Sequence, residues 1–312
     1  MKVAILDDYQ NVALTTADWS PVGARADITV FNDHLSDPDE VVERLAPFAA
    51  LCVMRERTPL PRSILERLPN LKMIASTGPG NASIDYDAAE ELGIRIDNTG
   101  YTSTPTIELT WALIMASARN IVDEVASVRA GGWQTSVGRE LHGRRLGILG
   151  LGRIGREIAR IGTAFGMEVL AWSQHLTPDQ AEEAGAIWVP KEALFAQSDI
   201  ITIHLVLSKR TRGLIGADEL AAMKPTSWLV NTSRGPIVDE SALLDALQRN
   251  SIGGAALDTY DTEPLPADHP LRSLPNALAT PHIGYVAEDL YRTFYGDAAV
   301  SIADWLDATE NG

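Results

Sequence analysis

Three polar segments of the chain carry residues that could together move a proton and hold a small anion. They read NTSRGPIVDE (231–240), ALDTYDTEPLP (256–266) and ATPHIGY (279–285). Histidine titrates near neutral pH, so His282 could give a proton to a developing alkoxide. A carboxylate such as Glu263 can fix the tautomer of that ring, and the guanidinium of Arg234 can grip two oxygens of a small acid. Taken singly, each residue is more often structural, as a surface ion pair, a loop residue or a satisfied histidine.

A glycine-rich segment has the spacing of a dinucleotide-binding turn. Residues 150–155 read Gly-Leu-Gly-Arg-Ile-Gly, after an apolar strand and before an amphipathic helix. In such a turn the first glycine permits the bend, the second lets a pyrophosphate approach the backbone, and the third allows close packing. The helix then offers unpaired N–H groups to the phosphates. The predicted cofactor residues here are Gly150, Gly152, Arg153, Ile154 and Gly155. The alternative is a plain glycine turn without a ligand.

The residue that follows the next strand bears on the choice of cofactor. Dinucleotide folds specific for NAD place an acidic residue there, about 20 residues past the glycines, to bind the ribose 2′-hydroxyl. This chain has Ser173, followed by Gln174 and His175, with no arginine in the turn. We therefore expect both NAD and NADP to be accepted, with a preference for NADP.

Strand-like and helix-like segments alternate along the whole chain, which predicts an α/β fold with parallel sheets. The expected strands of a first unit are 2–6, 28–31, 50–54, 72–77 and 94–97. A long apolar helix from Thr104 follows, with a polar linker over 131–143. The expected strands of a second unit are 146–150, 168–172, 200–205, 227–233, 254–258 and 277–281, with helices at 154–165, 191–196, 216–222 and 239–249. A C-terminal helix is expected over 287–306.

Composition narrows the class of protein. A net charge of −16 over 312 residues disfavours binding to nucleic acid or an anionic membrane. The start of the chain resembles a strand more than a signal peptide, and no apolar run is long enough to span a membrane. The single cysteine, Cys52, lies in an apolar stretch and is interpreted as core, and the histidines lack metal-ligand spacing. These features predict a cytoplasmic protein without a metal site.

The motifs jointly resemble the D-isomer-specific 2-hydroxyacid dehydrogenase family, in its glyoxylate/hydroxypyruvate reductase-like branch. The resemblance rests on RLGILGLGRIGREIAR, IHLVLSKRTRGLI and the three polar segments, in the order and spacing of that family. It implies hydride transfer between NAD(P)H and a small 2-oxo acid to give the D-2-hydroxy acid. It assigns substrate binding to Arg234, orientation of the histidine to Glu263, and acid/base catalysis to His282.

The same resemblance implies two doubly wound parallel-sheet domains and a homodimer. A flavodoxin-like substrate domain would comprise 1–100 plus 286–312, and a Rossmann NAD(P)-binding domain would comprise 101–285. The first domain would bind the substrate carboxylate through loop N–H groups. The helix over 104–120 would lie at the dimer interface, although on the sequence alone it could instead lie wholly between the two domains.

Further site residues follow from position in these motifs. The additional substrate contacts are Arg55, Thr77 and Gly78, and the additional cofactor contacts are Thr104, Val206, Thr232, Ser233 and Asp258. Arg55 could instead be a solvated charge, and Asp258 could be a strand-end cap. Two other functions stay open at this point: a nicotinamide-sensing module without turnover, and the same fold oxidising another small anion such as formate.

Overall fold

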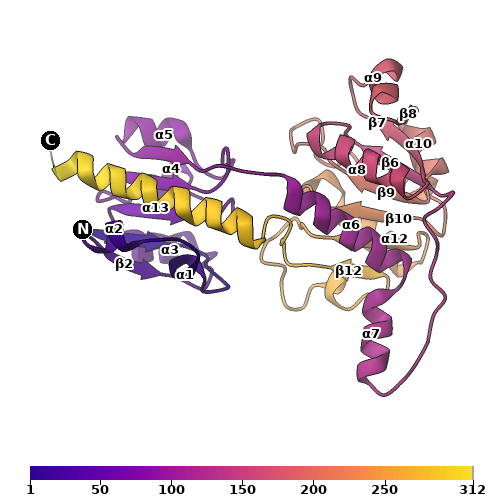
Figure 1. Ribbon diagram of the computed structural model, residues 1–312, viewed down its shortest axis with the longest axis horizontal. Helices are drawn as coiled ribbons and strands as arrows, with labels where there is room; N and C mark the ends of the chain where they lie inside the picture. The colour runs from indigo at the N-terminus through magenta and orange to yellow at the C-terminus, as the bar shows by residue number, and fades with distance from the viewer. Residues whose placement is uncertain (311–312) are drawn as a thin grey trace. The chain divides into compact units, whose positions relative to one another are not determined.

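The computed structural model describes residues 1–310, which divide into two compact units (Figure 1). Unit 1 comprises Met1–Thr102 and Val286–Gly312, and unit 2 comprises Ser103–Tyr285. The chain therefore leaves unit 1, completes unit 2, and returns. No helix within residues 1–310 is both long and apolar enough to cross a bilayer.

Unit 1 is a five-stranded parallel sheet in the order β2-β1-β3-β4-β5. Its strands are β1 (Lys2–Ile5), β2 (Asp27–Val30), β3 (Ala50–Val53), β4 (Met73–Ser76) and β5 (Arg95–Asn98). Its helices are α1 (Ala13–Thr16), α2 (Ser20–Gly23), α3 (Pro38–Leu45), α4 (Arg62–Leu65), α5 (Tyr86–Glu91) and α13 (Glu288–Glu310). The strand order is that of flavodoxin-like folds.

The core of unit 1 explains why its strands read as continuous apolar runs. All four residues of β3 and of β4 are buried, because helices cover both faces of a parallel sheet. The C-terminal helix α13 packs against α1, α2 and β4. Cys52 lies in β3 as a buried free thiol, and burial raises its pKa to about 12. Its predicted role in the core is confirmed.

Unit 2 is a seven-stranded sheet in the order β12-β11-β10-β9-β6-β7-β8, and its strand pairings are parallel. Its strands are β6 (Arg145–Leu149), β7 (Glu168–Trp172), β8 (Ile187–Trp188), β9 (Ile200–Ile203), β10 (Trp228–Asn231), β11 (Gly254–Leu257) and β12 (Ala277–Ala279). Its helices are α6 (Thr104–Ala118), α7 (Ile121–Arg129), α8 (Arg153–Ala164), α9 (Pro178–Glu183), α10 (Lys191–Gln197), α11 (Ala217–Ala222) and α12 (Glu240–Gln248), with short 3-10 helices η1 (Gly235–Ile237) and η2 (Pro270–Arg272).

The strand order of unit 2 changes direction at β6. From β6 the chain proceeds outward through β7 and β8, then crosses back to β9 and continues to β12. This is the Rossmann order, and it opens a crevice at the carboxyl end of β6. The predicted fold class, two doubly wound parallel sheets with a Rossmann unit inside a flavodoxin-like one, is confirmed.

Several short or exposed elements lie outside the sequence predictions, and three of them, β8, α9 and α7, bury almost nothing. Both residues of β8 are exposed, α9 buries only Ala181, and every residue of α7 keeps solvent exposure. Periodicity reports burial, so elements that bury little leave little pattern. The long helix expected from Thr104 is observed as α6, with Pro105 in its first turn.

Candidate active site

The glycine turn of unit 2 has the shape that a dinucleotide needs. Gly150 follows β6 with φ +98°, and a Cβ there would lie 2.5 Å from the His204 carbonyl oxygen. A Cβ on Gly155 would lie 2.1 Å from the Gly150 carbonyl oxygen. In contrast, a Cβ on Gly152 would meet no protein atom within 4 Å. Two glycines therefore permit packing, while the third faces open space at the amino end of α8, where a pyrophosphate fits.

The other predicted cofactor residues of unit 2 lie on the loops around this turn. Arg153 and half-buried Ile154 begin α8, and half-buried Ser173 follows β7. In the loop after β9, Val206 is 83% exposed, an unusual setting for an apolar residue. Thr104 is the exposed first residue of α6.

Two hydroxyl residues after β10 join that strand end to its neighbours. Thr232 Oγ1 lies 2.7 Å from Thr110 Oγ1 of α6. Ser233 Oγ donates to the Leu205 carbonyl oxygen at 2.5 Å, and its N–H donates to Asn231 Oδ1. These contacts fix the loops after β9 and β10 to one another at the carboxyl edge of the sheet.

The histidine and glutamate of the polar segments are in direct contact. His282 Nδ1 lies 2.5 Å from Glu263 Oε2, and the second carboxylate oxygen of Glu263 accepts the Tyr260 N–H at 2.9 Å. The backbone of His282 has φ +51°, a left-handed conformation that turns the ring out of the strand direction after β12. Within residues 1–310, Nε2 of His282 makes no hydrogen bond, so this nitrogen is open to a substrate.

Arg234 lies at the end of the neighbouring strand. It follows β10 and caps η1, where its Nη1 donates to the Ser233 carbonyl oxygen at 2.8 Å. The next residue, Gly235, approaches the second polar segment so closely that a Cβ would lie 2.1 Å from the Tyr260 carbonyl carbon. The segments of Arg234 and Glu263 thus touch through their backbones, and those of Glu263 and His282 touch through their side chains.

Asp258 is the anchor of the histidine segment. Its side chain is almost fully buried, and it accepts Thr280 Oγ1 at 2.6 Å and the N–H groups of Ile283 and Gly284 at 2.8 Å each. Burial raises the pKa of this carboxyl group despite these donors. These contacts are those expected of Asp258 in its alternative role, a residue that caps a strand end. Buried Tyr260 adds a hydrogen bond from its hydroxyl to the Thr280 carbonyl oxygen at 2.8 Å, a role that the sequence analysis missed.

The predicted substrate residues of unit 1 form one cluster. The Arg55 N–H donates to Thr77 Oγ1 at 2.8 Å, and its Nη1 donates to the Thr77 carbonyl oxygen at 3.0 Å. Its guanidinium lies over Gly78, where a Cβ would be 1.7 Å from Nη1. With 12% of its side chain exposed, Arg55 is not the solvated charge that the alternative interpretation required.

The N–H groups of Thr77 and Gly78 are themselves hydrogen-bonded within this unit. The Thr77 N–H donates to the Val53 carbonyl oxygen, and the Gly78 N–H donates to Thr99 Oγ1 at 2.8 Å. These two groups are therefore already committed within unit 1. Asn81, which was not singled out, holds the Arg55 carbonyl oxygen with its Nδ2 at 2.6 Å.

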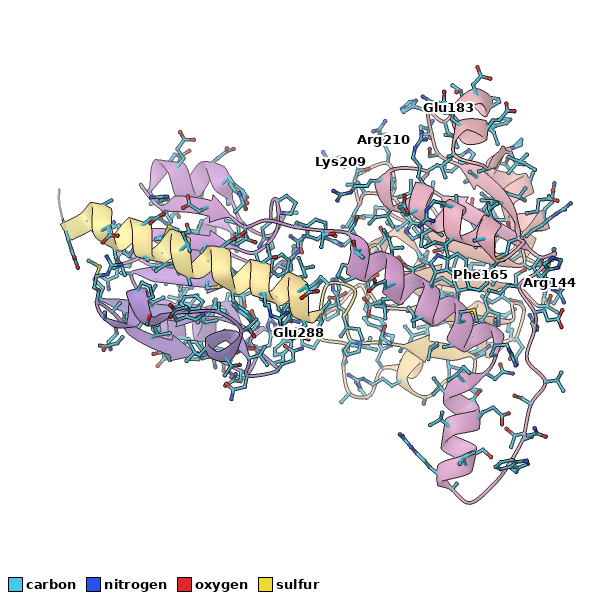
Figure 2. All side chains as sticks on the ribbon, in the orientation of Figure 1. Arg144, Phe165, Glu183, Lys209, Arg210 and Glu288 are labelled. Atoms are coloured by element: carbon cyan, nitrogen blue, oxygen red, sulfur yellow. The ribbon has the colours of Figure 1, made fainter. Side chains whose placement is uncertain are left out.

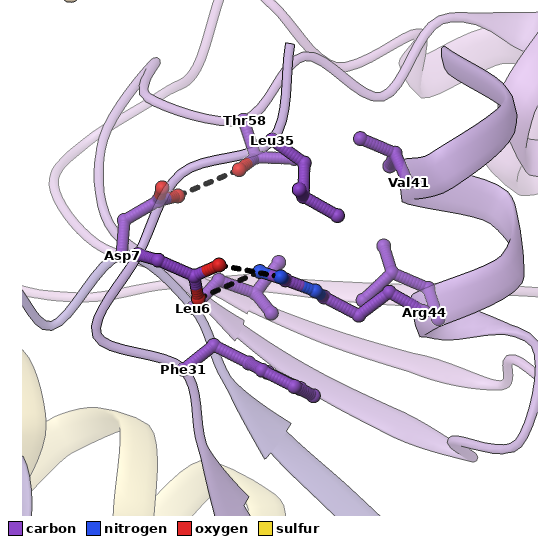
Figure 3. Close-up of a pocket in the computed structure, with 9 residues that line it drawn as sticks. Leu6, Asp7, Phe31, Leu35, Val41, Arg44 and Thr58 are labelled. Atoms are coloured by element: carbon purple, nitrogen blue, oxygen red, sulfur yellow. Dashed lines mark hydrogen bonds and ion pairs between the residues drawn. The ribbon is translucent and has the colours of Figure 1, made fainter. Parts of the chain in front are cut away.

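A second polar cluster of unit 1 is structural (Figure 3). Asp7, after β1, accepts Thr58 Oγ1 at 2.6 Å and lies 3.0 Å from His34 Nδ1. Arg44 crosses the ring of Phe31 and pairs with Asp33. The cavity between these groups measures only about 10 Å³, room for one water molecule at most. The cluster therefore holds loops of unit 1 together, and its cavity has no space for a substrate.

The fold and the site define a dinucleotide-dependent dehydrogenase: a Rossmann unit with an open glycine turn, and a histidine–carboxylate pair with an arginine at neighbouring strand ends. The family model for the D-isomer specific 2-hydroxyacid dehydrogenase NAD binding domain matches residues 111–284. Hence the chain belongs to the D-isomer specific 2-hydroxyacid dehydrogenase family, and it is an NAD(P)-dependent 2-oxoacid reductase/2-hydroxyacid dehydrogenase.

Named relatives agree with this assignment. Glyoxylate reductase of Aeropyrum pernix is 43% identical over 229 residues, which cover 70% of this chain and 68% of that protein. Hydroxypyruvate reductase of Blautia hydrogenotrophica is 30% identical over 316 residues, covering 98% and 97%. A crystal structure of phosphoglycerate oxidoreductase from Vibrio cholerae superposes with a TM-score of 0.93 at 40% identity, covering 99% of each chain.

Proposed function

We propose that this enzyme reduces a small 2-oxo acid, glyoxylate or hydroxypyruvate, to the corresponding 2-hydroxy acid, which is the D isomer where the product is chiral. The observation that carries the proposal is the 2.5 Å contact between His282 Nδ1 and Glu263 Oε2 at the strand ends beside Arg234. Relatives named for glyoxylate and hydroxypyruvate support this choice of substrate. When bound, the reduced nicotinamide supplies the hydride.

In this proposal the three residues divide the remaining work. The guanidinium of Arg234 binds the carboxylate and the carbonyl oxygen of the substrate and fixes the face that is reduced. His282 donates a proton from Nε2 to the oxygen that gains negative charge. Glu263 accepts from Nδ1, which fixes the tautomer and stabilises the protonated ring.

The remaining proposed contacts hold the two ligands. Gly152, Arg153 and Ile154 would receive the pyrophosphate at the amino end of α8. The proposed flanking contacts to the dinucleotide are Thr104, Ser173, Val206, Thr232, Ser233 and Asp258. In unit 1, Arg55, Thr77 and Gly78 remain the proposed additional substrate contacts, with the guanidinium of Arg55 as the charged group, because the N–H groups of Thr77 and Gly78 have partners within the unit.

A substrate panel with both cofactors tests this proposal. Glyoxylate, hydroxypyruvate, pyruvate and phosphohydroxypyruvate would each be assayed with NADH and NADPH by nicotinamide absorbance, and the product resolved on a chiral column. We expect the highest kcat/KM with one of the first two acids, the D-isomer where the product is chiral, and a preference for NADPH. Absence of turnover with every 2-oxo acid, together with tight cofactor binding, would instead indicate a sensing module. Oxidation of formate alone would indicate a different donor.

We further propose a homodimer formed through the arm of residues 121–137, which consists of α7 and the segment after it. Figure 1 shows α7 projecting from the rest of unit 2. Its Ile121, Val122, Val125 and Val128 are between 42% and 55% exposed, and Trp133 is 74% exposed. The apolar side chains of α6, in contrast, pack into the core of unit 2. Because a monomer rarely exposes so many apolar side chains together, a second copy is the proposed cover. The cytoplasm stays the predicted compartment and fits the reduced, buried Cys52.

A further inference from the structure

We propose that Lys209 and Arg210 bind the 2′-phosphate of NADPH and so set the cofactor preference of this enzyme. The inference rests on the proposed function, because it takes the dinucleotide to lie on the glycine turn of unit 2. The site would recognise a phosphomonoester on an adenosine ribose. It lies on the loop after β9, whereas NADP-binding folds are expected to carry such a cation on the turn after β7.

The sheet order places this loop beside the glycine turn. β6, which ends in that turn, lies between β7 and β9. At the end of β9, the His204 carbonyl oxygen and the Leu205 side chain are the nearest atoms to a Cβ built on Gly150. Since parallel strands share one carboxyl edge, the turn of Ser173 and the loop after β9 flank the dinucleotide turn from its two sides.

Figure 2 places the two cations on the correct side of unit 2. Lys209 and Arg210 project outward at the side opposite Arg144 and Phe165. Arg144 precedes β6, and Phe165 ends α8, so these two residues mark the far edge of the unit. The side of Lys209 and Arg210 is therefore the one where β6 ends and α8 begins.

The loop that carries the two cations is held in one shape. Thr211 Oγ1 donates to the Val206 carbonyl oxygen at 2.7 Å and accepts the Ser208 N–H at 2.8 Å. The Arg210 N–H donates to Ser208 Oγ at 3.3 Å, and the Gly213 N–H donates to the Pro236 carbonyl oxygen at 2.8 Å. Little loop entropy would be lost when a phosphate binds, which favours a preformed site.

Charge is consistent with the same assignment. Within residues 1–310, the side chains of Lys209 and Arg210 make no ion pair or hydrogen bond, whereas Lys191 and Lys224 of the same unit pair with Glu219 and Asp199. Two adjacent unpaired cations stand out on a chain of net charge −16. The acidic side chains of α9 are Asp179, Glu182 and Glu183, and within residues 1–310 none of them forms an ion pair with either cation.

The opposite side of the turn is compatible with a phosphate. Ser173 offers a hydroxyl where an acidic residue would repel a 2′-phosphate, and neighbouring His175 and Gln174 are exposed donors. Arginine forms paired hydrogen bonds to phosphate oxygens, and lysine adds a mobile point charge. Together they supply the positive charge that the β7 turn itself lacks.

The test separates binding of the phosphate from turnover. Lys209→Ala, Arg210→Ala and the double variant would be titrated by calorimetry with adenosine 2′,5′-bisphosphate and with adenosine 5′-monophosphate, which differ only in the 2′-phosphate. Steady-state KM values for NADPH and NADH would be measured on the same proteins. The matched control is Arg144→Ala with Arg249→Ala, which removes two positive charges at the opposite edge of the sheet.

We expect the wild-type protein to bind the bisphosphate more tightly than the monophosphate, and each single variant to lose about tenfold or more of that difference. The KM for NADPH should rise accordingly while kcat and the KM for NADH stay unchanged, and the control pair should match wild type. Equal affinity of the wild-type protein for both adenosine phosphates would overturn the inference, and so would equal losses for NADPH and NADH in the variants. A protein inactive towards every 2-oxo acid would refute the proposed function instead, and the calorimetry would still decide the phosphate site.

Discussion

Two histidine–glutamate pairs of unit 2 resemble each other in contact but differ in what their second ring nitrogen does. His282 Nδ1 lies 2.5 Å from Glu263, and His269 Nε2 lies 3.1 Å from Glu240. Nδ1 of His269 accepts the Leu271 N–H, so its ring is fully used within the fold. A hydrogen-bonded histidine alone therefore does not mark a catalytic one, whereas a histidine with one nitrogen open at a strand end has a proton to give.

This contrast supplies a controlled test at the residue scale. We expect His282→Ala to lower kcat by about 10²–10⁴-fold, because the developing alkoxide loses its proton donor. Glu263→Gln keeps a hydrogen-bonding group of the same size without its charge and should give a smaller loss. His269→Ala should leave kcat unchanged. Steady-state kinetics on variants with wild-type circular dichroism measures these effects, and near-normal turnover of His282→Ala would remove that residue from the mechanism.

His204, beside the glycine turn, makes stability depend on pH. Burial lowers its pKa from an ordinary 6.5 to about 3, and its Nε2 lies 2.9 Å from Thr202 Oγ1. The unfolded chain takes up this proton below about pH 6.5, whereas the folded chain does so only near pH 3. The stability that neutral His204 provides is therefore complete above pH 6.5 and is lost as pH falls through that window.

His204→Gln should flatten this dependence. We expect the unfolding free energy of the wild-type protein to fall more between about pH 7.5 and pH 5 than that of the variant. Because His204 keeps some solvent exposure, the difference should stay below the limit of about 1.4 kcal/mol per pH unit set by one proton. Urea denaturation at the two pH values measures it, with exposed His175→Gln as control. Parallel slopes for wild type and His204→Gln would contradict the assignment.

At the scale of elements, the glycines of the β6–α8 turn differ in what surrounds them, and so we expect their substitution to have different effects. A methyl group on Gly155 would strike a backbone carbonyl, and one on Gly152 would enter open space. Gly155→Ala should therefore lower the unfolding free energy by about 1–3 kcal/mol. Gly152→Ala should fold with normal stability but bind cofactor about tenfold or more weakly, because its methyl group occupies the place of the pyrophosphate. Thermal melts and cofactor titrations distinguish the two, and a destabilised Gly152→Ala that binds cofactor normally would contradict the division.

At the scale of the whole molecule, we expect the arm of residues 121–137 to decide the oligomeric state. Val125 and Val128 of α7 are 42% and 55% exposed. We expect Val125→Asp with Val128→Asp to convert a dimer to a monomer, since two carboxylates would have to be buried without partners. Light scattering at micromolar concentration measures the mass, with Val300→Asp as control, because Val300 is an exposed residue of α13. A wild-type monomer would refute the proposed dimer, and an unaltered dimer in the double variant would place the interface elsewhere.

The sequence by itself determined the fold class, most strands, the glycine turn, and the residues that could do chemistry. These features depend on local order: buried parallel strands read as apolar runs, and Gly150, Gly152 and Gly155 need only their own neighbourhood to form a turn. The order of Arg234, Glu263 and His282 along the chain likewise places them after successive strands, and parallel strands end at one edge.

The tertiary structure alone decided how those residues are used. The N–H of Gly78 donates a hydrogen bond to the Thr99 hydroxyl. Both carboxylate oxygens of Asp258 accept backbone N–H groups of the segment that carries His282. The half-buried Arg55 side chain donates to the Thr77 carbonyl oxygen. Each of these partners is distant in sequence, and periodicity carries no information about which donor meets which acceptor. Elements that bury nothing, such as α7, leave no pattern at all, and the sequence likewise does not show which charged side chains, such as Lys209 and Arg210, make no ion pair.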